Sequence, residues 1–182
     1  KPEDWSEDKT RNETDIIKTR VTRMIEQELR DDPYAQEAFS KLLRKAIEEA
    51  EQLFDHPLKQ YLLFCEFEEQ VQERKLDDIP DAFDGNRHAQ AYFGVFKKVL
   101  PEGVTTQDEQ GKWVELALQI DELVEASVAE NSINTQNIEA DIRKKLLPML
   151  FKQCKAIGAG MDQAKAIVEW VVQITRVGLS GI

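Results

Sequence analysis

The chain has 182 residues, of which 41% are apolar and 32% are charged, and its formal net charge at pH 7 is −11. No apolar run approaches the roughly 20 residues that a bilayer-spanning helix needs, and an acidic net charge repels both DNA and anionic membranes at long range. The charge is uneven, however. From residue 131 to the end, seven bases and four acids give +3, so the first 130 residues carry −14. This asymmetry is compatible with a basic face on an acidic protein.

The start of the chain and its two cysteines indicate in which cellular compartment the protein is expected. The first residue is Lys1 rather than Met and no signal peptide is recognisable, so we expect part of a longer, cytoplasmic polypeptide. Cys65 and Cys154 lie far apart on apolar stretches, with no spacing typical of a disulfide framework. We therefore expect two buried free thiols, as is usual in a reducing compartment.

The first half of the chain shows helical periodicity after an irregular start. Residues 1–12 are polar apart from Trp5, and we expect an irregular lead-in there. Apolar residues then recur every three or four positions, which is the spacing of one buried helix face. Pro33 and Pro57 suit the first position of a helix, where the missing N–H costs nothing. Helices are predicted over about 13–30, 33–54, 57–75 and 86–100, with Asn86 as the N-cap of the last.

The second half continues the pattern after one loop. Residues 101–111 are the most loop-like stretch, and we expect a mobile loop there. Pro148 should kink or break the helix that contains it, and Gly178 should end the last helix. Further helices are predicted over about 112–129, 135–155 and 162–177. The sequence thus predicts an all-α protein, a single irregular bundle of about seven helices that spans 13–182.

Patterns that would indicate catalysis or ligand binding are weak. Gly158 and Gly160 come nearest to a phosphate-binding loop, but no basic residue or hydroxyl follows at the required place. Neither His56 nor His88 lies in a cluster with metal-ligand spacing. The acidic runs are typical of solvated helix faces. We therefore predict no catalytic, cofactor-binding or metal-binding residue in the chain.

One stripe of cations could contact nucleic acid. Four lysines of the predicted 135–155 helix fall within about a third of its circumference at 100° per residue, away from its apolar face. Such a stripe could neutralise several phosphates and would bind in a salt-sensitive way without reading sequence. An ordinary solvated face is the plainer interpretation, and it stays open. The four are Lys144, Lys145, Lys152 and Lys155; Arg143, and Arg87, Lys97 and Lys98 of the predicted 86–100 helix, complete the candidate DNA-binding set.

Several segments resemble one protein family. They are DDPYAQEAFSKLLRKAIEEAEQLFDHPLKQYLLFCEFEEQV (31–71), DDIPDAF (77–83), NRHAQAYFGVFKKVL (86–100), VAENSINTQNIEADIRKKLLPMLFK (128–152) and AKAIVEWVVQITRVGLSG (164–181). Together they resemble the C-terminal helical region of the motor subunit, the R subunit, of bacterial type I restriction–modification enzymes. The similarity covers nearly all of the chain and keeps the order of the segments.

The resemblance implies a role inside a larger enzyme. In that family the R subunit also carries a nuclease domain and two RecA-like motor domains, which use ATP and Mg to pull DNA. The resemblance implies that this chain docks the motor onto the methyltransferase and specificity subunits and could contact the DNA backbone. We expect no enzyme activity and no cofactor in the chain itself, because the nuclease and helicase motifs lie elsewhere in the family. The parent would be a type I site-specific deoxyribonuclease with ATP-dependent translocase activity.

Two other interpretations stay open. A helical bundle could bind a small molecule between its third and fourth helices, where four aromatic residues fall: Tyr61, Phe64, Tyr92 and Phe96. Such aromatic residues are more often plain core. The chain could also be a purely structural module without an outside partner. A contiguous exposed apolar patch would favour docking over that interpretation.

Overall fold

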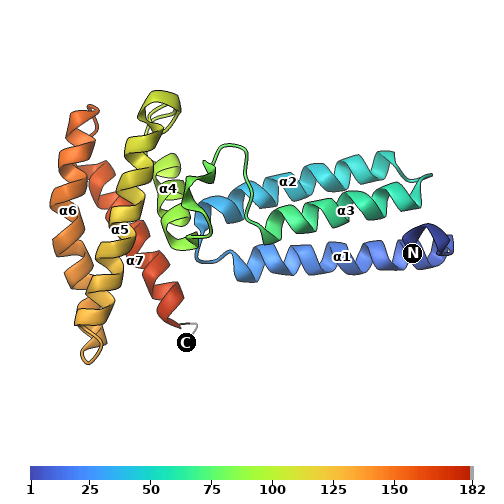
Figure 1. The fold of residues 1–182 in the computed structure, drawn as a ribbon, viewed down its shortest axis with the longest axis horizontal. Helices are drawn as coiled ribbons and strands as arrows, with labels where there is room; N and C mark the ends of the chain where they lie inside the picture. The colour runs from blue at the N-terminus through green and yellow to red at the C-terminus, as the bar shows by residue number, and fades with distance from the viewer. Residues whose placement is uncertain (181–182) are drawn as a thin grey trace. The chain divides into compact units, whose positions relative to one another are not determined.

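The computed structural model describes residues 1–180, and the regular structure in that range is entirely helical (Figure 1). The prediction of an all-α protein with about seven helices is confirmed. The α-helices are α1 (Glu7–Glu28), α2 (Pro33–Gln52), α3 (Pro57–Gln72), α4 (Arg87–Val99), α5 (Gln110–Glu130), α6 (Ile138–Ala156) and α7 (Met161–Ser180). The 3₁₀ helices are η1 (Pro2–Asp4), η2 (Asp81–Phe83), η3 (Gln107–Glu109) and η4 (Thr135–Asn137).

Helix α1 begins earlier than the sequence pattern predicted. The predicted irregular lead-in covered residues 1–12, whereas α1 starts at Glu7. The side chain of Ser6 accepts a hydrogen bond from the backbone N–H of Lys9 at 3.3 Å, which satisfies one of the unpaired donors of the first turn. Apolar periodicity starts only farther along the chain, so it could not mark this polar first turn.

Two helix boundaries in the second half also differ from prediction, and the expected interruption at Pro148 is not a break. Helix α5 starts at Gln110, inside the loop predicted over 101–111. Helix α6 runs through Pro148 without a break. The prediction that Gly178 ends the last helix was wrong, because α7 continues to Ser180. Gly178 is not among the glycines with a positive φ, so no left-handed turn forms there that would need a glycine.

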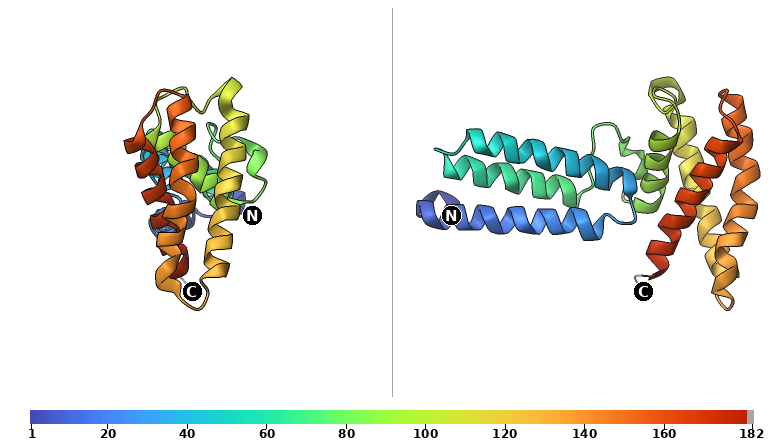
Figure 2. Two further views of the ribbon diagram at one scale, coloured as in Figure 1. Left: turned by 90° about the vertical axis from the view of Figure 1, so that its left-hand side faces the viewer. Right: turned by 180° about the vertical axis from the view of Figure 1, so that it is seen from behind.

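The helices group into two compact units, which are described separately. Unit 1 consists of residues 1–30 and 35–78. Within it α1 packs against α3, and α1, α2 and α3 lie side by side in all views (Figures 1 and 2). The rings of Phe39 on α2 and Phe67 on α3 meet edge to face with their centroids 6.3 Å apart. The buried apolar residues of this unit include Val21, Ile25, Phe39, Phe64, Phe67 and Val71.

Unit 2 consists of residues 31–34 and the chain from Ile79 onward, and α4 packs against both α5 and α7 within it. Helix α6 packs against α5 and α7 (Figure 2). An aromatic chain runs through this core. The ring centroids of Phe93 and Phe96 lie 6.5 Å apart, and those of Phe96 and Trp113 lie 5.0 Å apart. All three side chains are fully buried, and burial of each contributes up to about 3 kcal/mol to folding.

A glycine allows one close helix contact in unit 2. A Cβ atom placed on Gly94 of α4 would lie 2.6 Å from the Cβ atom of Tyr34. That separation is far below van der Waals contact, and packed interiors tolerate such overlap poorly. Glycine is therefore required at this position for steric reasons, although it weakens a helix interior.

Replacement of Gly94 by alanine should destabilise the protein. We expect Gly94→Ala to lower the free energy of unfolding by about 1–3 kcal/mol, because the added methyl group must displace Tyr34 or α4. Urea unfolding followed by circular dichroism measures the change. Gly178→Ala is the matched control, since nothing lies within 4 Å of its added Cβ atom. It should raise stability by up to about 1 kcal/mol; equal effects of the two substitutions would contradict this account.

Candidate functional site

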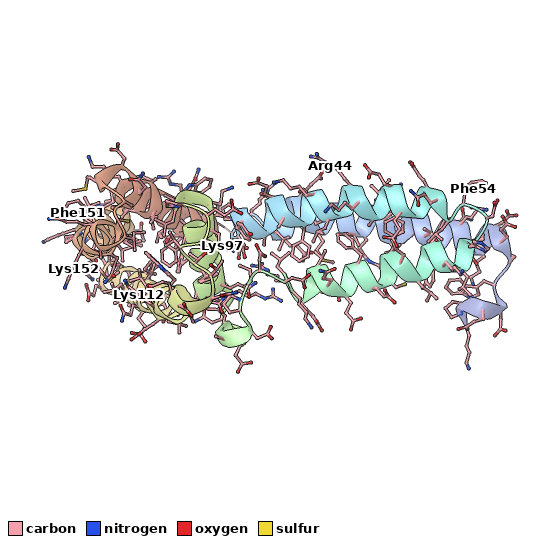
Figure 3. The ribbon with its side chains drawn as sticks, turned by 90° about the horizontal axis from the view of Figure 1, so that it is seen from above. Arg44, Phe54, Lys97, Lys112, Phe151 and Lys152 are labelled. Carbon is pink, nitrogen blue, oxygen red and sulfur yellow. The ribbon has the colours of Figure 1, made fainter. Side chains whose placement is uncertain are left out.

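Three lysines of the predicted basic stripe are exposed on α6. Lys144, Lys152 and Lys155 form no ion pair among the described residues, and Lys152 extends from the outer edge of the helix (Figure 3). Their positions place them within about a quarter of the helix circumference. These three ammonium groups therefore form one exposed basic face, which we call the α6 lysine face.

Arg143 instead takes part in an ion-pair network between α6 and α7. Its Nε and Nη2 atoms donate to the two carboxylate oxygens of Glu169 at 2.8 and 3.1 Å. Arg176 of α7 donates in the same paired manner to Glu139 of α6 at 2.8 and 3.0 Å. A 3.6 Å contact between Arg143 and Glu139 joins the two pairs. Bidentate geometry of this kind is specific as well as favourable, so these arginines hold α6 against α7.

Lys145 is neutralised locally as well. Its ammonium group lies 2.8 Å from a carboxylate oxygen of Glu130 and 3.0 Å from one of Asp141. The hydrogen bond to Glu130, followed by that to Asp141, raises the pKa of Lys145 above its ordinary value. A lysine that is already bonded to two carboxylates contributes little net charge to an approaching phosphate.

The remaining basic candidates lie on α4. The ammonium groups of Lys97 and Lys98 extend over aromatic rings, at 5.9 Å from the ring centroid of Tyr34 and 5.4 Å from that of Trp170. Arg87 is the first residue of α4. Helix α4 packs against α5 and α7, whereas the three exposed lysines lie on α6. The structure therefore brings Lys144, Lys152 and Lys155 together on α6. Arg143 and Lys145 are used in ion pairs, and the other three candidates lie on α4.

A pocket of about 360 Å³ lies between α4, α5 and α7. Its walls are mostly apolar, and its titratable side chains are His88, Tyr92, Asp121 and Glu125. The other lining residues are Val124, Val128, Ala129, Ile174, Thr175, Gly178 and Leu179. Apolar walls with a few polar groups are typical of ligand pockets. We call this cavity the α4/α5/α7 pocket.

Asp121 is the most unusual side chain of the pocket, because it is only 6% exposed. Its Oδ2 atom accepts a hydrogen bond from Nδ2 of Asn86 at 2.9 Å. Asn86 in turn caps α4 as predicted, since its Oδ1 atom accepts from the backbone N–H of Ala89 at 3.0 Å. The Nδ1 atom of His88 lies 3.8 Å from Oδ1 of Asp121, which is too far for a hydrogen bond. Asp121 therefore fixes the start of α4 with one oxygen and leaves the other without a donor.

Tyr92 and Thr175 contribute further polar groups beside the pocket. Burial raises the pKa of Tyr92 far above its ordinary value, although a hydrogen bond with Thr175 acts in the opposite direction. The hydroxyl of Thr175 donates to the backbone carbonyl of Val171 at 2.9 Å. Tyr92 is therefore a neutral phenol at physiological pH, and the negative charge of the pocket belongs to its carboxylates.

The four aromatic residues of the small-molecule hypothesis belong to different units. Tyr61 and Phe64 lie in unit 1, and Tyr92 and Phe96 lie in unit 2. Phe64 and Phe96 are core residues in their own units, and Tyr92 lines the α4/α5/α7 pocket. Sequence reasoning therefore identified one pocket residue for this hypothesis and missed Asp121. The sequence did contain one indication of this site, because Asp121 is an acidic residue next to the inward-facing positions of the helix predicted over 112–129.

The structure also shows the surroundings of the two cysteines and of His56, which the sequence analysis considered. Cys65 and Cys154 are free thiols, of which Cys154 is buried and Cys65 is half-buried. His56 occupies the N-cap position of α3, and its side chain makes no capping hydrogen bond. Within residues 1–180, no three or more His, Cys, Asp and Glu side chains converge as a metal-binding group. None of the helices described here combines the length and apolarity that a bilayer-spanning helix requires.

Five large apolar side chains are exposed in the described range: Ile16, Phe54, Leu62, Ile133 and Met161. Phe54 is 64% exposed and lies in the turn between α2 and α3 (Figure 3). The guanidinium of Arg11 lies 4.6 Å from the centroid of its ring, and the same group donates to the backbone carbonyl of Phe54 at 3.0 Å. The exposed ring is therefore held in place by a neighbouring cation.

Comparison of the chain with known protein families, with curated proteins and with solved structures finds no match.

Loss of one network carboxylate should have a pH-dependent effect on stability. We expect Glu169→Gln to lower the free energy of unfolding at pH 7 by about 0.2–1 kcal/mol, the range for exposed ion pairs. The hydrogen bond from Arg143 lowers the pKa of Glu169 in the folded protein. The carboxylate's contribution is therefore complete above the ordinary Glu pKa of about 4.3 and is lost as the pH falls through the lowered value.

Urea unfolding of the wild type and the variant between acidic and neutral pH measures this effect, and the difference between them should disappear at the acidic end. Glu115→Gln is the control, because Glu115 is exposed on α5 and forms no ion pair among the described residues. A constant difference for Glu169→Gln across the whole pH range would argue against the network.

Proposed function

We propose that this chain is a helical assembly module of the R subunit of a type I restriction–modification enzyme. In this proposal it works in the cytoplasm and docks the motor onto the methyltransferase and specificity subunits. The nuclease and the ATP- and Mg-dependent motor belong to other domains of the parent, and the chain itself performs no catalytic step.

The distribution of the resembling segments carries the proposal. The 31–71 segment covers α2 and nearly all of α3, the 86–100 segment covers α4, and the later segments cover most of α6 and of α7. The resemblance therefore extends through both compact units rather than through one isolated helix pair. An assembly role also suits a protein whose exposed groups are spread over many helices, because docking uses broad surfaces rather than one reacting centre.

The exposed ring of Phe54 supports a docking role. Aromatic side chains often dominate the binding energy of protein interfaces. A ring that is already held by Arg11 loses little conformational freedom when a partner covers it. Phe54 is the only aromatic residue among the large apolar side chains exposed in the described range. We therefore place Phe54 in the docking surface.

Docking is tested by mixing the chain with a purified methyltransferase–specificity core and separating the mixture by size exclusion. We expect co-elution at micromolar concentrations. Phe54→Ala should weaken the complex by about 30-fold, the effect of a strong interface residue. Ile133→Ala is the matched control, since Ile133 is 92% exposed but is not aromatic. Absence of co-elution with the wild-type chain would count against the docking function itself.

A second candidate function, contact with the DNA backbone, is favoured by the α6 lysine face. Lys144, Lys152 and Lys155 are exposed, and their positions on one side of α6 suit a row of phosphates. The net charge of −11 opposes such contact at long range, so binding would be weak and confined to this face. In the assembled enzyme, docking would hold the face near DNA and compensate for the weak affinity.

DNA contact should therefore depend strongly on salt. For three phosphate contacts, the logarithm of the binding constant should fall with a slope of about −2.7 against the logarithm of salt concentration, or about 40-fold between 50 and 200 mM. Replacement of Lys144, Lys152 and Lys155 by glutamate should abolish binding in a fluorescence anisotropy titration with duplex DNA.

The control replaces three exposed lysines of unit 1, Lys45, Lys59 and Lys75, by glutamate. Both triple variants change the net charge by the same amount, so only the position of the charges differs. DNA binding that survives substitution of the α6 lysine face, or that is lost equally in the control, would refute contact through that face.

A further inference from the structure

The α4/α5/α7 pocket contains a buried carboxylate oxygen without a donor. Oδ1 of Asp121 accepts no hydrogen bond from any described residue, and the side chain is more than nine-tenths buried. The neighbouring amide of Asn86 is already used, because its oxygen caps α4 and its nitrogen donates to Oδ2 of Asp121. Burial of an ionised carboxylate is unfavourable unless a donor or an opposite charge compensates it. The pocket thus offers an unused acceptor to a ligand.

The charges around this oxygen favour a cation. Asp121 and Glu125 supply two carboxylates to the pocket, and neither lysine nor arginine occurs among its described lining residues. His88 is the only basic side chain there, and it is 58% exposed at 3.8 Å from Asp121. A positively charged donor would satisfy Oδ1 of Asp121 and gain attraction from Glu125.

The walls decide which kind of cation fits. Val124, Val128, Ile174 and Leu179 are apolar, and a bare metal ion would find too few oxygen ligands among them. An organic cation on a hydrocarbon stem matches both parts, because its stem covers the apolar wall while its charged end reaches the carboxylate. The volume of about 360 Å³ lies within the range of small-ligand pockets.

We propose that the α4/α5/α7 pocket binds an alkylguanidinium or alkylammonium group through Asp121. The same chemistry is available from a free amine or guanidine and from an arginine or lysine side chain of a partner protein. The experiment below therefore tests the site with a free probe first and then distinguishes the two sources.

The first arm uses hexylguanidinium as the probe and the whole chain as the protein. Titration followed by ¹H–¹⁵N NMR should show saturable shifts at pocket residues, with a Kd of about 1 mM or lower. Hexanol, which has the same stem without the charge, should bind at least tenfold more weakly. Absence of saturable binding, or equal binding of hexanol, would overturn the proposal.

Two variants test the location of the site. Asp121→Asn removes the charge but keeps an oxygen that can accept from Asn86. Gly178→Leu fills the pocket without a change of charge, since Gly178 lines the pocket and nothing lies within 4 Å of its added Cβ atom. Both should weaken hexylguanidinium binding at least tenfold. Glu122→Gln is the matched control, because Glu122 is an exposed acid next to Asp121 on α5 and does not line the pocket.

The test of the site does not depend on correct folding of Asp121→Asn. If Asp121→Asn proves unfolded by circular dichroism, Gly178→Leu still decides, because it introduces a better helix former at an exposed position. Unchanged affinity in a folded Gly178→Leu variant would overturn the proposal. An equal loss in Glu122→Gln would also overturn it, by showing that the probe responds only to the overall charge.

The second arm identifies the source of the cation by use of the methyltransferase–specificity core. Competition by hexylguanidinium and weaker core binding of Gly178→Leu would support a partner's arginine or lysine as the occupant. Unchanged core binding, together with hexylguanidinium binding in the first arm, would support a free amine or guanidine. Failure of the core to bind any form of the chain would concern the docking function alone, because the first arm does not depend on it.

Discussion

The packing of α4 against α5 and α7 is the constraint on which unit 2 depends. Phe96 and Trp113 bring α4 and α5 together in a fully buried aromatic contact. Gly94 lets α4 approach the Cβ atom of Tyr34 more closely than any other residue would permit. The same three helices form the walls of the pocket. The contacts that stabilise unit 2 therefore also form the pocket that contains Oδ1 of Asp121. Among the described residues, this is the one buried carboxylate oxygen without a hydrogen-bond donor.

Charge compensation explains why only part of the basic stripe is left unpaired among the described residues. Arg143 and Lys145 have acidic neighbours on α7 and α5, and these pairs hold the helices together. Lys144, Lys152 and Lys155 have no such neighbour among the described residues. Helix α6 thus uses some of its cations for internal packing and presents others to solvent. The charge pattern of the sequence cannot distinguish the paired cations from the unpaired ones, because it does not show which carboxylates lie beside each cation in the folded protein.

The proposed docking, DNA-contact and cation-binding roles use separate parts of the chain. Phe54 belongs to unit 1, whereas the α6 lysine face and the α4/α5/α7 pocket belong to unit 2. The lysine face is positive and the pocket is negative, so the two surfaces of unit 2 suit ligands of opposite charge. Under this proposal, such a division would let one small helical module contact several components of an assembly without competition for a single surface.

The sequence by itself determined the helical class, the number of helices, the Asn86 cap and the side of α6 on which its lysines lie, because helix periodicity and capping are local properties. Only the tertiary structure decided the division into two units, the pairing of Arg143 and Lys145, and the pocket around Asp121. Each of these depends on which side chains meet across helices that are distant in sequence. Asp121 illustrates the difference, since Asn86, which donates to it, and Thr175, which lines the same pocket, both lie far from it along the chain.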